Sequence, residues 1–422
     1  MYLADSRSPE PAAAPDLRPG RRRAAVPSTV LALGAVSLIT DVSSEMVTAV
    51  LPLYVVAGLG LSPLGFGLLD GINNGVGALV RLAGGHLADR GGRRHKVVAG
   101  LGYGLSALCK PLLLLAHTVP VIGAVLAADR TGKGLRTAPR DAMISLATEP
   151  RYRGRAFGVH RAMDTTGALL GPLVAFAVLR ATVDGYDAVF AVSGCVAVLG
   201  VLVLVLFVPR HLVPAGAAQP PEPARPVLRD APGLLRRPEL RRLTVCATLL
   251  GLTTVSDSFL YLLLQREGAL SAALFPLLPL GTAAVFLVLA LPLGVLADRV
   301  GSRRLFLAGH GVLLLGYGLV LSPWQGAPAV VAVLVLHGTF YAATDGVLAA
   351  ATAGAVPDRR QGAGQALVGT GQALARFTCS LAFGAAWSLW GGRTALAVTA
   401  AALAVSAVVA SFVLRTTDEV PA

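Results

Sequence analysis

Charged side chains are scarce in this chain of 422 residues, since Asp, Glu, Lys and Arg together make up 14% of it. Ordinary soluble domains carry about 25% of these residues. Hydrophobic residues make up 55% of the chain, and its mean hydropathy is +0.68. This composition excludes an ordinary water-soluble domain and indicates a protein that is embedded in a lipid bilayer.

Cysteine is scarce as well. The chain has four cysteines, which stand singly inside apolar segments, without C-x-x-C spacing and without histidine clusters beside them. A disulfide framework or a zinc site needs Cys and His residues at close and regular spacing. We therefore expect no disulfide, no metal site and no cofactor.

A nucleotide-binding loop is missing too. The stretch TGKG at 131–134 places a glycine before a lysine, but Gly134 follows Lys133 where the G-x-x-x-x-G-K-[ST] pattern requires Ser or Thr. No Ser-His-Asp or metal-ligand cluster stands out in the sequence. We therefore predict that the protein is not an enzyme, and that an ion gradient, rather than nucleotide hydrolysis, supplies its energy.

Acidic residues are fewer than basic ones, and the net charge is +13. Such an excess can indicate a nucleic-acid partner. With both termini placed in the cytosol, however, 25 of the 36 lysines and arginines fall in the tails or in cytosolic loops. The positive-inside rule explains this asymmetry, so we expect cytosolic termini and no nucleic-acid partner. The apolar segment that follows PGRRRAAVP is too long for a cleaved export signal.

Long apolar runs recur between residues 30 and 414. Most of them have roughly the 20 residues that a helix needs to cross the bilayer core. Their Gly and Pro residues are tolerated in spanning helices because neighbouring helices satisfy the freed backbone groups. The sequence therefore predicts an all-α membrane protein with twelve transmembrane helices, at 30–56, 63–88, 97–116, 119–146, 156–180, 187–208, 243–264, 272–297, 304–322, 328–354, 362–388 and 393–414.

One sequence motif occurs twice and divides the chain into two halves. GHLADRGGRR at 85–94 returns as GVLADRVGSRR at 294–304, each at the cytosolic end of a predicted span. Such a repeat is typical of one six-helix unit that is used twice. We therefore expect a cytosolic tail at 1–29, a six-helix bundle at 30–208, a cytosolic linker at 209–242, a second six-helix bundle at 243–414 and a cytosolic tail at 415–422.

In each copy of the motif, a tight glycine turn can set the aspartate against the arginines of a neighbouring helix end. A charge pair at the membrane edge can hold helices together and release them during a conformational change. A plain, positively charged turn is the alternative. The residues of this predicted conformational latch are Gly85, Asp89, Arg90, Arg93, Arg94, Gly294, Asp298, Arg299, Arg303 and Arg304.

The two loops resemble the signature loop of the major facilitator superfamily of secondary transporters and its echo in the second half. The segment LAADRTGKGLRTA at 126–138 is similar to the fourth-helix pattern of that superfamily, with Lys133 and Arg136 as departures. The combination of TDVSSEM, DRTGKGLRTAPRDA and HRAMD is similar to a bacterial permease subgroup whose substrates are largely unassigned. The resemblance implies two six-helix repeats around a central cavity in the bacterial cytoplasmic membrane, and transport of a small molecule by alternating access.

The predicted fifth helix resembles the antiporter signature of exporters in the same superfamily. The positions that match it are Gly158, Gly167, Gly171 and Pro172. Ala175 and Phe176 replace its closing glycine pair. The resemblance implies proton-coupled antiport, that is, efflux of a small organic molecule, and we expect the protein to be a monomer. The residues leave two alternatives open, which are proton-coupled uptake of a polar metabolite and a receptor or scaffold that transports nothing.

Charged residues inside membrane spans are costly, by about 2.5 to 3.5 kcal/mol each, and therefore usually serve a function. On the predicted fourth helix, Asp129 and Lys133 are spaced for an i,i+4 ion pair. On the fifth, either His160 or Arg161 can pair with Asp164. A network of ion pairs that only orders the helices is the alternative for these charges. The lone Lys110 of the third helix lies near enough to its outer end to extend to the membrane surface.

We predict proton coupling at the four residues Asp41, Glu45, Asp129 and Arg130. A carboxylate that alternately meets water and protein can load and release a proton as a cavity opens and closes. Our hypothesis takes Asp41 or Glu45 as the proton carrier and Arg130 as the modulator. The predicted contacts with the substrate are Asn73, Asn74, Lys133, Arg136, Asp164, Asp257, Tyr341, Asp345 and Arg376.

Overall fold

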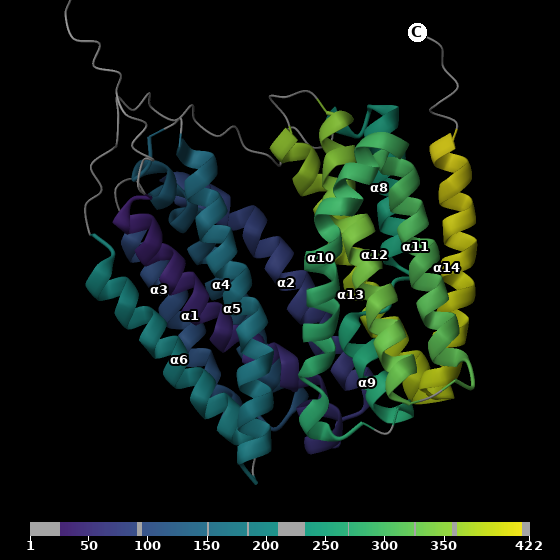
Figure 1. Ribbon diagram of the computed structural model, residues 1–422, viewed down its shortest axis with the longest axis horizontal. Coiled ribbons are helices and arrows are strands. Elements are labelled where there is room, and N and C mark those ends of the chain that lie inside the picture. The colour runs from purple at the N-terminus through teal and green to yellow at the C-terminus, as the bar shows by residue number, and fades with distance from the viewer. Residues whose placement is uncertain are drawn as a thin grey trace, which may run out of the picture.

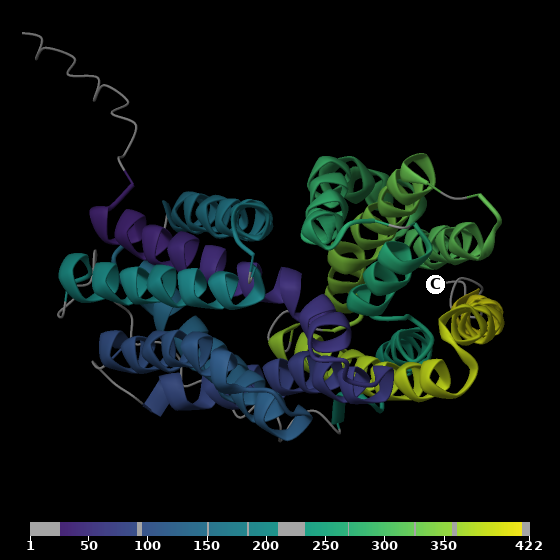
Figure 2. The same cartoon turned by 90° about the horizontal axis from the view of Figure 1, so that it is seen from below.

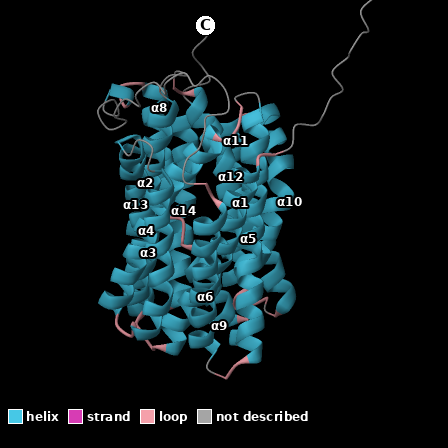
Figure 3. Ribbon diagram, turned by 90° about the vertical axis from the view of Figure 1, so that its left-hand side faces the viewer, coloured by secondary structure: helices cyan, strands magenta, loops and turns pink. Residues whose placement is uncertain are grey.

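The computed structural model describes residues 26–90, 95–149, 152–183, 185–209, 233–268, 270–324, 326–356 and 361–415. Side chains are described in these ranges except at 77–79, 81–90, 361–363 and 415. The described chain is helical, without a strand, as Figure 3 shows. The predicted all-α fold is therefore confirmed.

The first half consists of long helices that follow one another with short connections. Their bounds are α1 Ser28–Leu53, which continues as a π-helical turn at Tyr54–Gly58, α2 Pro63–Arg90, α3 His95–Leu112 with a 3-10 turn at Leu113–Leu115, α4 Val119–Leu146, α5 Arg153–Ala181 and α6 Gly185–Phe207. The predicted span at 119–146 coincides with α4.

Within the described residues, the second half has one helix more than the first, because one predicted span is divided in two. Its bounds are α8 Pro238–Gly251, α9 Asp257–Glu267, a 3-10 turn at Ala272–Leu274, α10 Leu277–Val300, α11 Ser302–Leu321, α12 Ala327–Gly354, α13 Gln361–Trp390 and α14 Gly392–Arg415. The single continuous helix that we predicted over 243–264 is wrong, since the chain leaves the helix between α8 and α9.

Local hydrogen bonds explain this break. Thr254 turns its hydroxyl back to the carbonyl oxygen of Leu250 at 2.8 Å, a side-chain bond that competes with helical pairing. The backbone N–H of Val255 donates to the Tyr317 hydroxyl of α11 at 2.8 Å instead of to a helical carbonyl. A backbone break at membrane depth needs such substitute partners. Periodicity alone does not reveal it, because the threonines and the serine of 252–256 are also compatible with a helix.

The two halves stand side by side (Figure 1), with α1 to α6 on one side and α8 to α14 on the other. In the first half α1 packs against α5 and α6, and α3 packs against α4. In the second half α11 and α10 both pack against α12. Figure 2 shows α2 of the first half meeting α13 of the second.

Glycines bring α2 and α13 into close contact at one end of the molecule. A Cβ atom added at Gly67 would overlap the backbone of Ser380, and one at Gly384 would overlap the carbonyl group of Pro63. The backbone N–H of Leu64 also donates to the Ser388 hydroxyl at 3.1 Å. We call this contact of 63–75 with 377–388 the closed end. It lies at the start of α2 and at the end of α13, opposite the first residue of α1 and the last residue of α14.

Many helices have the length and the apolar surface that a bilayer requires. Among the described residues, eight helices are long and apolar enough to cross a membrane by themselves. The outer surfaces of α6 and α14 carry large exposed apolar side chains, among them Leu202, Phe207, Val405 and Phe412. In water such surfaces would be unfavourable, whereas lipid tails can cover them.

Candidate functional site

A central cavity of about 420 Å³ lies between the two halves. The first half contributes α1 and α2, and the second contributes the break before α9 together with α9, α10, α12 and α13. The wall is rich in polar groups, which include Glu45, Thr48, Asp70, Asn73, Asn74, Thr254, Ser256, Asp257, Ser258, Tyr261, Thr282, Tyr341, Asp345, Arg376 and Ser380.

Six of the nine predicted substrate contacts line this cavity, namely Asn73, Asn74, Asp257, Tyr341, Asp345 and Arg376. The other three, Lys133, Arg136 and Asp164, belong to ion pairs inside the first half. Periodicity placed each residue on the correct helix. It could not separate the side of α4 that faces the cavity from the side that faces α1.

Asp41 on α1 lies between two cations of α4. Its Oδ1 is 3.1 Å from Nη2 of Arg136 and 3.9 Å from Nζ of Lys133. Lys133 also lies 3.8 Å from Oε1 of Glu45, which is part of the cavity wall. The guanidinium of Arg136 stacks 4.5 Å above the ring of Tyr103. One lysine therefore connects a buried carboxylate with a carboxylate that meets the cavity.

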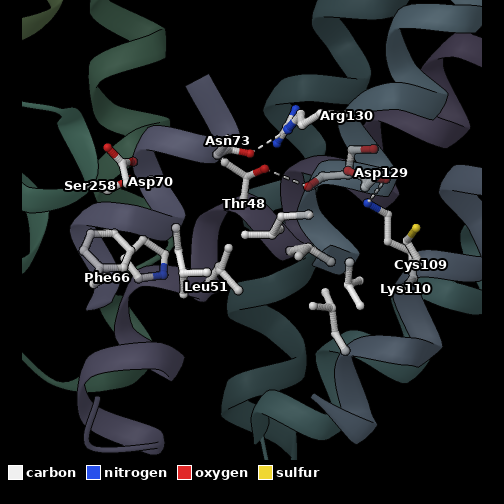
Figure 4. A pocket seen from close by; sticks show the side chains of 17 residues that line it. Thr48, Leu51, Phe66, Asp70, Asn73, Cys109, Lys110, Asp129, Arg130 and Ser258 are labelled. Carbon is white, nitrogen blue, oxygen red and sulfur yellow. Dashed lines mark hydrogen bonds and ion pairs between the residues drawn. The ribbon is translucent and has the colours of Figure 1, made fainter. Parts of the chain in front are cut away.

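Asp129 pairs with a different residue from the one that we predicted. Its Oδ1 is 3.0 Å from Nζ of Lys110 on α3, and the two side chains are only 7% and 3% exposed. Figure 4 shows the two side chains pointing toward one another. The predicted pair of Asp129 with Lys133 is therefore wrong, and so is the expectation that Lys110 extends to the membrane surface.

Close packing of α3 on α4 accounts for this pair. A Cβ atom at Gly102 would overlap the carbonyl oxygen of Gly132, and one at Gly132 would overlap that of Gly102. The two backbones are therefore nearly in contact, so the side chains on either side of the glycines face one another. The spacing rule for one helix does not describe such an interhelical pair.

Arg130 points toward α2 rather than toward Asp41. Its Nε donates to Oδ1 of Asn73 at 2.6 Å, as drawn in Figure 4. Both residues line a smaller pocket that also holds Thr48 and Asp70 and that shares these walls with the central cavity. Arg136, and not Arg130, is the arginine that contacts Asp41.

A second group of ion pairs extends the network from α4 to α5. Arg140 binds Asp141 through Nε at 3.0 Å and lies 3.7 Å from Asp164. Arg161 lies 3.6 Å from Asp164. His160 instead lies 3.0 Å from the Ser37 hydroxyl. Of the two partners that the sequence left open for Asp164, Arg161 is the one in contact.

The second half presents another polar cluster at the break in its first span. Oδ1 of Asp257 accepts hydrogen bonds from the Tyr341 hydroxyl at 2.6 Å and from Nε2 of His337 at 3.0 Å. On the opposite wall, the Ser380 hydroxyl donates to Oδ2 of Asp70 at 2.6 Å, a bond that joins the two halves. Asp257 and Tyr341 were predicted at the site, whereas His337 and Ser380 were not. The signal for His337 was a lone histidine in the apolar run VLVLHGTF.

The predicted latch is only partly described. Arg93 and Arg94 lie outside the described residues, and for Gly85, Asp89 and Arg90 only the backbone, in α2, is described. In the second copy, α10 and α11 meet at a tight turn in which Gly301 has a φ of +93°. There Nη2 of Arg303 lies 3.8 Å from Oε2 of Glu239 on α8, whereas Asp298 is exposed. At this turn, Arg303 therefore pairs with a carboxylate of α8. Gly294 and Arg299 lie in α10 before this turn, and Arg304 lies in the first turn of α11.

The antiporter-type glycines separate into two groups. Cβ atoms at Gly167 and Gly171 would overlap the α1 backbone at Leu38 and Val42, so these two glycines allow α5 to pack closely on α1. Pro172 is buried beside them. Gly158 has open space around it.

A family model described as the Major Facilitator Superfamily matches the chain in two overlapping segments, residues 33–288 and 254–422. The chain belongs to the Major Facilitator Superfamily. It is therefore an integral membrane transporter and not an enzyme, and its described helices belong to the twelve-helix fold of the superfamily.

Curated relatives cover most of the chain. An uncharacterized MFS-type transporter of Methanocaldococcus jannaschii is 28% identical over 325 residues, which are 74% of this chain and 77% of the relative. An uncharacterized protein of Mycobacterium tuberculosis is 31% identical over 296 residues, which are 65% of this chain and 67% of the relative.

Solved transporter structures share the fold at low sequence identity. A bacterial homolog of the human lysosomal transporter Spinster, in an inward-facing and unoccupied conformation, has a TM-score of 0.75 at 17% identity and covers 92% of this chain and 96% of its own. The nucleoside transporter NupG has a TM-score of 0.76 at 13% identity and covers 92% and 99%. At these identities the likeness shows the fold alone.

Proposed function

We propose that this transporter exports a small organic molecule from the cytosol in exchange for protons, as a monomer in the bacterial cytoplasmic membrane. In this proposal the termini, the linker 209–242 and the two GxLADR loops face the cytosol. The closed end is then at the outer face, and the cavity loads from the cytosol. The placement of the basic residues supports this topology.

The position of Lys133 carries the proposal. Its ammonium lies within 4 Å of two carboxylates, of which Asp41 is buried and Glu45 forms part of the cavity wall. Three charges share this contact, so a change in the charge of one changes the net attraction that holds the group together. A proton that enters from the cavity reaches Glu45 first, because Glu45 is 27% exposed and Asp41 only 9%.

Protonation of Glu45 gives a simple way to connect a proton to a helix movement. When Glu45 is charged, Lys133 is attracted to two carboxylates of α1, which strengthens the contact of α4 with α1. When Glu45 is neutral, Lys133 is attracted to Asp41 alone and that contact is weaker. Two arrangements of packed helices whose balance depends on one proton are what alternating access requires.

The glycines that resemble the antiporter signature support the antiport proposal, and two of them lie at a helix contact. Gly167 and Gly171 bring α5 against α1, the helix that carries Asp41 and Glu45. Ion pairs of α4 with α1 and α5 connect the same three helices. The close α1–α5 contact is therefore joined to α4, which packs mainly on α2 and α3, through ion pairs, so a change in these charges can move the two groups of helices against one another.

Charge-removing variants in proteoliposomes test this proposal. The transported compound is first identified by comparing extracellular metabolites of cells that carry or lack the gene. We expect Asp41→Asn and Glu45→Gln to bind this compound but to lose at least 90% of pH-gradient-driven transport. Asp187→Asn, on α6 and away from the ion pairs, is the control and should transport normally. If Asp41→Asn and Glu45→Gln both keep gradient-driven transport, the assignment is wrong.

A further inference from the structure

Two opposite charges at the wall of the central cavity lack a direct partner. Asp345 on α12 is exposed and Arg376 on α13 is half-buried, and both line the cavity. Within the part of the chain that the structure describes, neither forms a hydrogen bond or an ion pair, with each other or with a third residue. Their charges are nevertheless close enough to attract one another. An acid and a base therefore face the same cavity without direct contact.

The other three carboxylates of the cavity wall are bound by protein groups. Oδ1 of Asp257 accepts two hydrogen bonds from α12, and Oδ2 of Asp70 accepts one from Ser380. Glu45 lies 3.8 Å from the ammonium of Lys133. Asp70 and Asp257 attract the guanidinium of α13 at longer range, but neither contacts it. A ligand that binds by charge therefore meets one carboxylate and one guanidinium that no protein group in the described structure has engaged.

The chemistry of these two groups defines what each can bind. The planar guanidinium of Arg376 offers paired N–H donors that match the two oxygens of a carboxylate. The carboxylate of Asp345 accepts hydrogen bonds from an ammonium group. A ligand with one charge would satisfy only one of these groups and would displace water from the other, which is unfavourable. The pair therefore favours a ligand that carries both charges.

An apolar surface lies on the α10 side of the same cavity. Pro279, Ala283 and Phe286 line it at a spacing of four and three residues, which places them along one face of the helix. The cavity volume of about 420 Å³ is within the range of small-molecule sites. The cavity can therefore take an apolar group together with the two charges.

We propose that the transported compound is a small zwitterion with an apolar side group, whose carboxylate binds Arg376 and whose ammonium binds Asp345. The proposal rests on the transport function above and names its substrate class. Both charged ends of the compound are held by α12 and α13, two helices of the second half that contact one another. The ion pairs of Asp41 lie in the first half and are separate from this site.

Ligand analogues that lack one charge test the proposal on the unmodified protein. Phenylalanine, leucine and the dipeptide leucylphenylalanine are the probes, and calorimetry measures their binding to the purified full chain in detergent. Each probe is compared with its C-terminal amide, which lacks the carboxylate, and with its N-formyl derivative, which lacks the ammonium. At least one zwitterion should bind at least about tenfold more tightly than both of its derivatives, because each derivative loses one charge-assisted contact. If no zwitterion is preferred to its derivatives, the proposal is overturned.

Two variants then assign each charge of the ligand to its residue. Arg376→Gln should bind the preferred zwitterion at least about tenfold more weakly but its amide no more weakly, because the amide has no carboxylate to lose. Asp345→Asn should weaken binding of the zwitterion and of the amide, but not of the N-formyl derivative. A merely structural role would weaken all three ligands alike. If either variant fails to fold, the series on the unmodified protein still decides.

Matched controls make the same charge changes outside the cavity. Arg180→Gln at the end of α5 and Asp187→Asn at the start of α6 should bind all three ligands like the wild type. Arg376→Gln and Asp345→Asn proteins that fold and keep the preference of the wild type would contradict the assignment.

Failure of this proposal is distinguishable from failure of the proposed function. Binding is measured without a membrane gradient, and Asp41→Asn and Glu45→Gln should keep the preference for the zwitterion while they lose gradient-driven transport. If those two variants lose coupled transport of a compound that is not a zwitterion, the substrate class is wrong and the antiport function stands. If they keep it while the zwitterion preference is found, the reverse holds.

Discussion

At the scale of single residues, the ion pairs of the first half place charges where burial is costly. Lys110 and Asp129 are both buried, and each neutralises the other. Taking one of them away leaves a charge without a partner at membrane depth, whereas replacing both by apolar residues removes the cost of burial as well. Asp129 therefore has a structural role that is separate from its predicted part in proton coupling.

We expect Lys110→Met and Asp129→Leu to destabilise the protein by about 3 to 5 kcal/mol each, because a buried charge loses its partner. The double variant should recover most of this loss. Unfolding in mixed micelles with increasing dodecyl sulfate measures both the loss of stability and its recovery. Single variants as stable as the wild type would show that the pair is not formed.

The double variant also tests Asp129 as a coupling residue. If Lys110→Met with Asp129→Leu transports against a pH gradient like the wild type, Asp129 serves the structure alone. If it is stable but uncoupled, the predicted role in proton coupling stands.

Sequence reasoning at this scale placed the buried charges on the right helices but often gave them the wrong partners. The i,i+4 rule paired Asp129 with Lys133 because both are on one helix. The actual partner, Lys110, follows from a backbone contact between Gly102 and Gly132 that no local pattern contains. Arg136 was predicted to line the cavity, but it contacts Asp41. A local pattern does not reveal this either, because the packing between helices determines which side of α4 faces the cavity.

At the scale of helices, glycines determine which helices approach most closely. Gly167 packs on the α1 backbone at Leu38, whereas Gly158 on the same helix has no neighbour there. The glycine pattern of the fifth helix could be read from the sequence. The division of its members into packed and open positions could not, because it depends on where α1 crosses α5.

Gly167→Ala should destabilise the protein by about 1 to 3 kcal/mol, because the added methyl group overlaps the Leu38 carbonyl. Gly158→Ala is the matched control and should be neutral or slightly stabilising, since alanine favours a helix. The same micelle unfolding assay compares them. Equal effects of the two substitutions would contradict close α1–α5 packing.

The break between α8 and α9 depends on Tyr317. We expect Tyr317→Phe to cost about 1 to 3 kcal/mol, because the buried N–H of Val255 loses its acceptor. Tyr54→Phe is the control, since the Tyr54 hydroxyl is buried without a partner in the described structure. Thermal unfolding of both variants measures the difference. A Tyr317→Phe protein as stable as Tyr54→Phe would mean that the break needs no such bond.

At the scale of the whole molecule, the two halves meet at the closed end and share the cavity behind it. The repeat, the twelve spans and the superfamily fold could all be predicted from hydropathy and from the repeated GxLADR motif. The broken span could not, because its threonines are compatible with a helix until Tyr317 is placed. The closed end could not either, because it depends on contacts between residues such as Gly67 and Ser380, far apart in the chain.

Substitution at the closed end should shift the protein toward the opposite conformation. Gly67→Ala and Gly384→Ala place methyl groups on the facing backbone, so we expect the closed end, which we propose to face the outside, to open. In a variant with Ser256→Cys in the cavity, an impermeant maleimide added outside cells should then react at least about tenfold faster, a shift of about 1.4 kcal/mol. Gly369→Ala on α13, which has open space, is the control. An unchanged rate of maleimide labelling would contradict the proposal that the closed end seals the cavity from the outside.

The direction of coupling is the central claim, and proton movement in inverted membrane vesicles tests it most directly. Respiration acidifies the vesicle interior, and acridine orange fluorescence reports the pH gradient. For a proton-coupled exporter, adding the transported compound should release protons from the vesicles and restore fluorescence, and Glu45→Gln vesicles should not respond. A response of Glu45→Gln vesicles equal to the wild type, or no movement of protons on transport, would contradict the account.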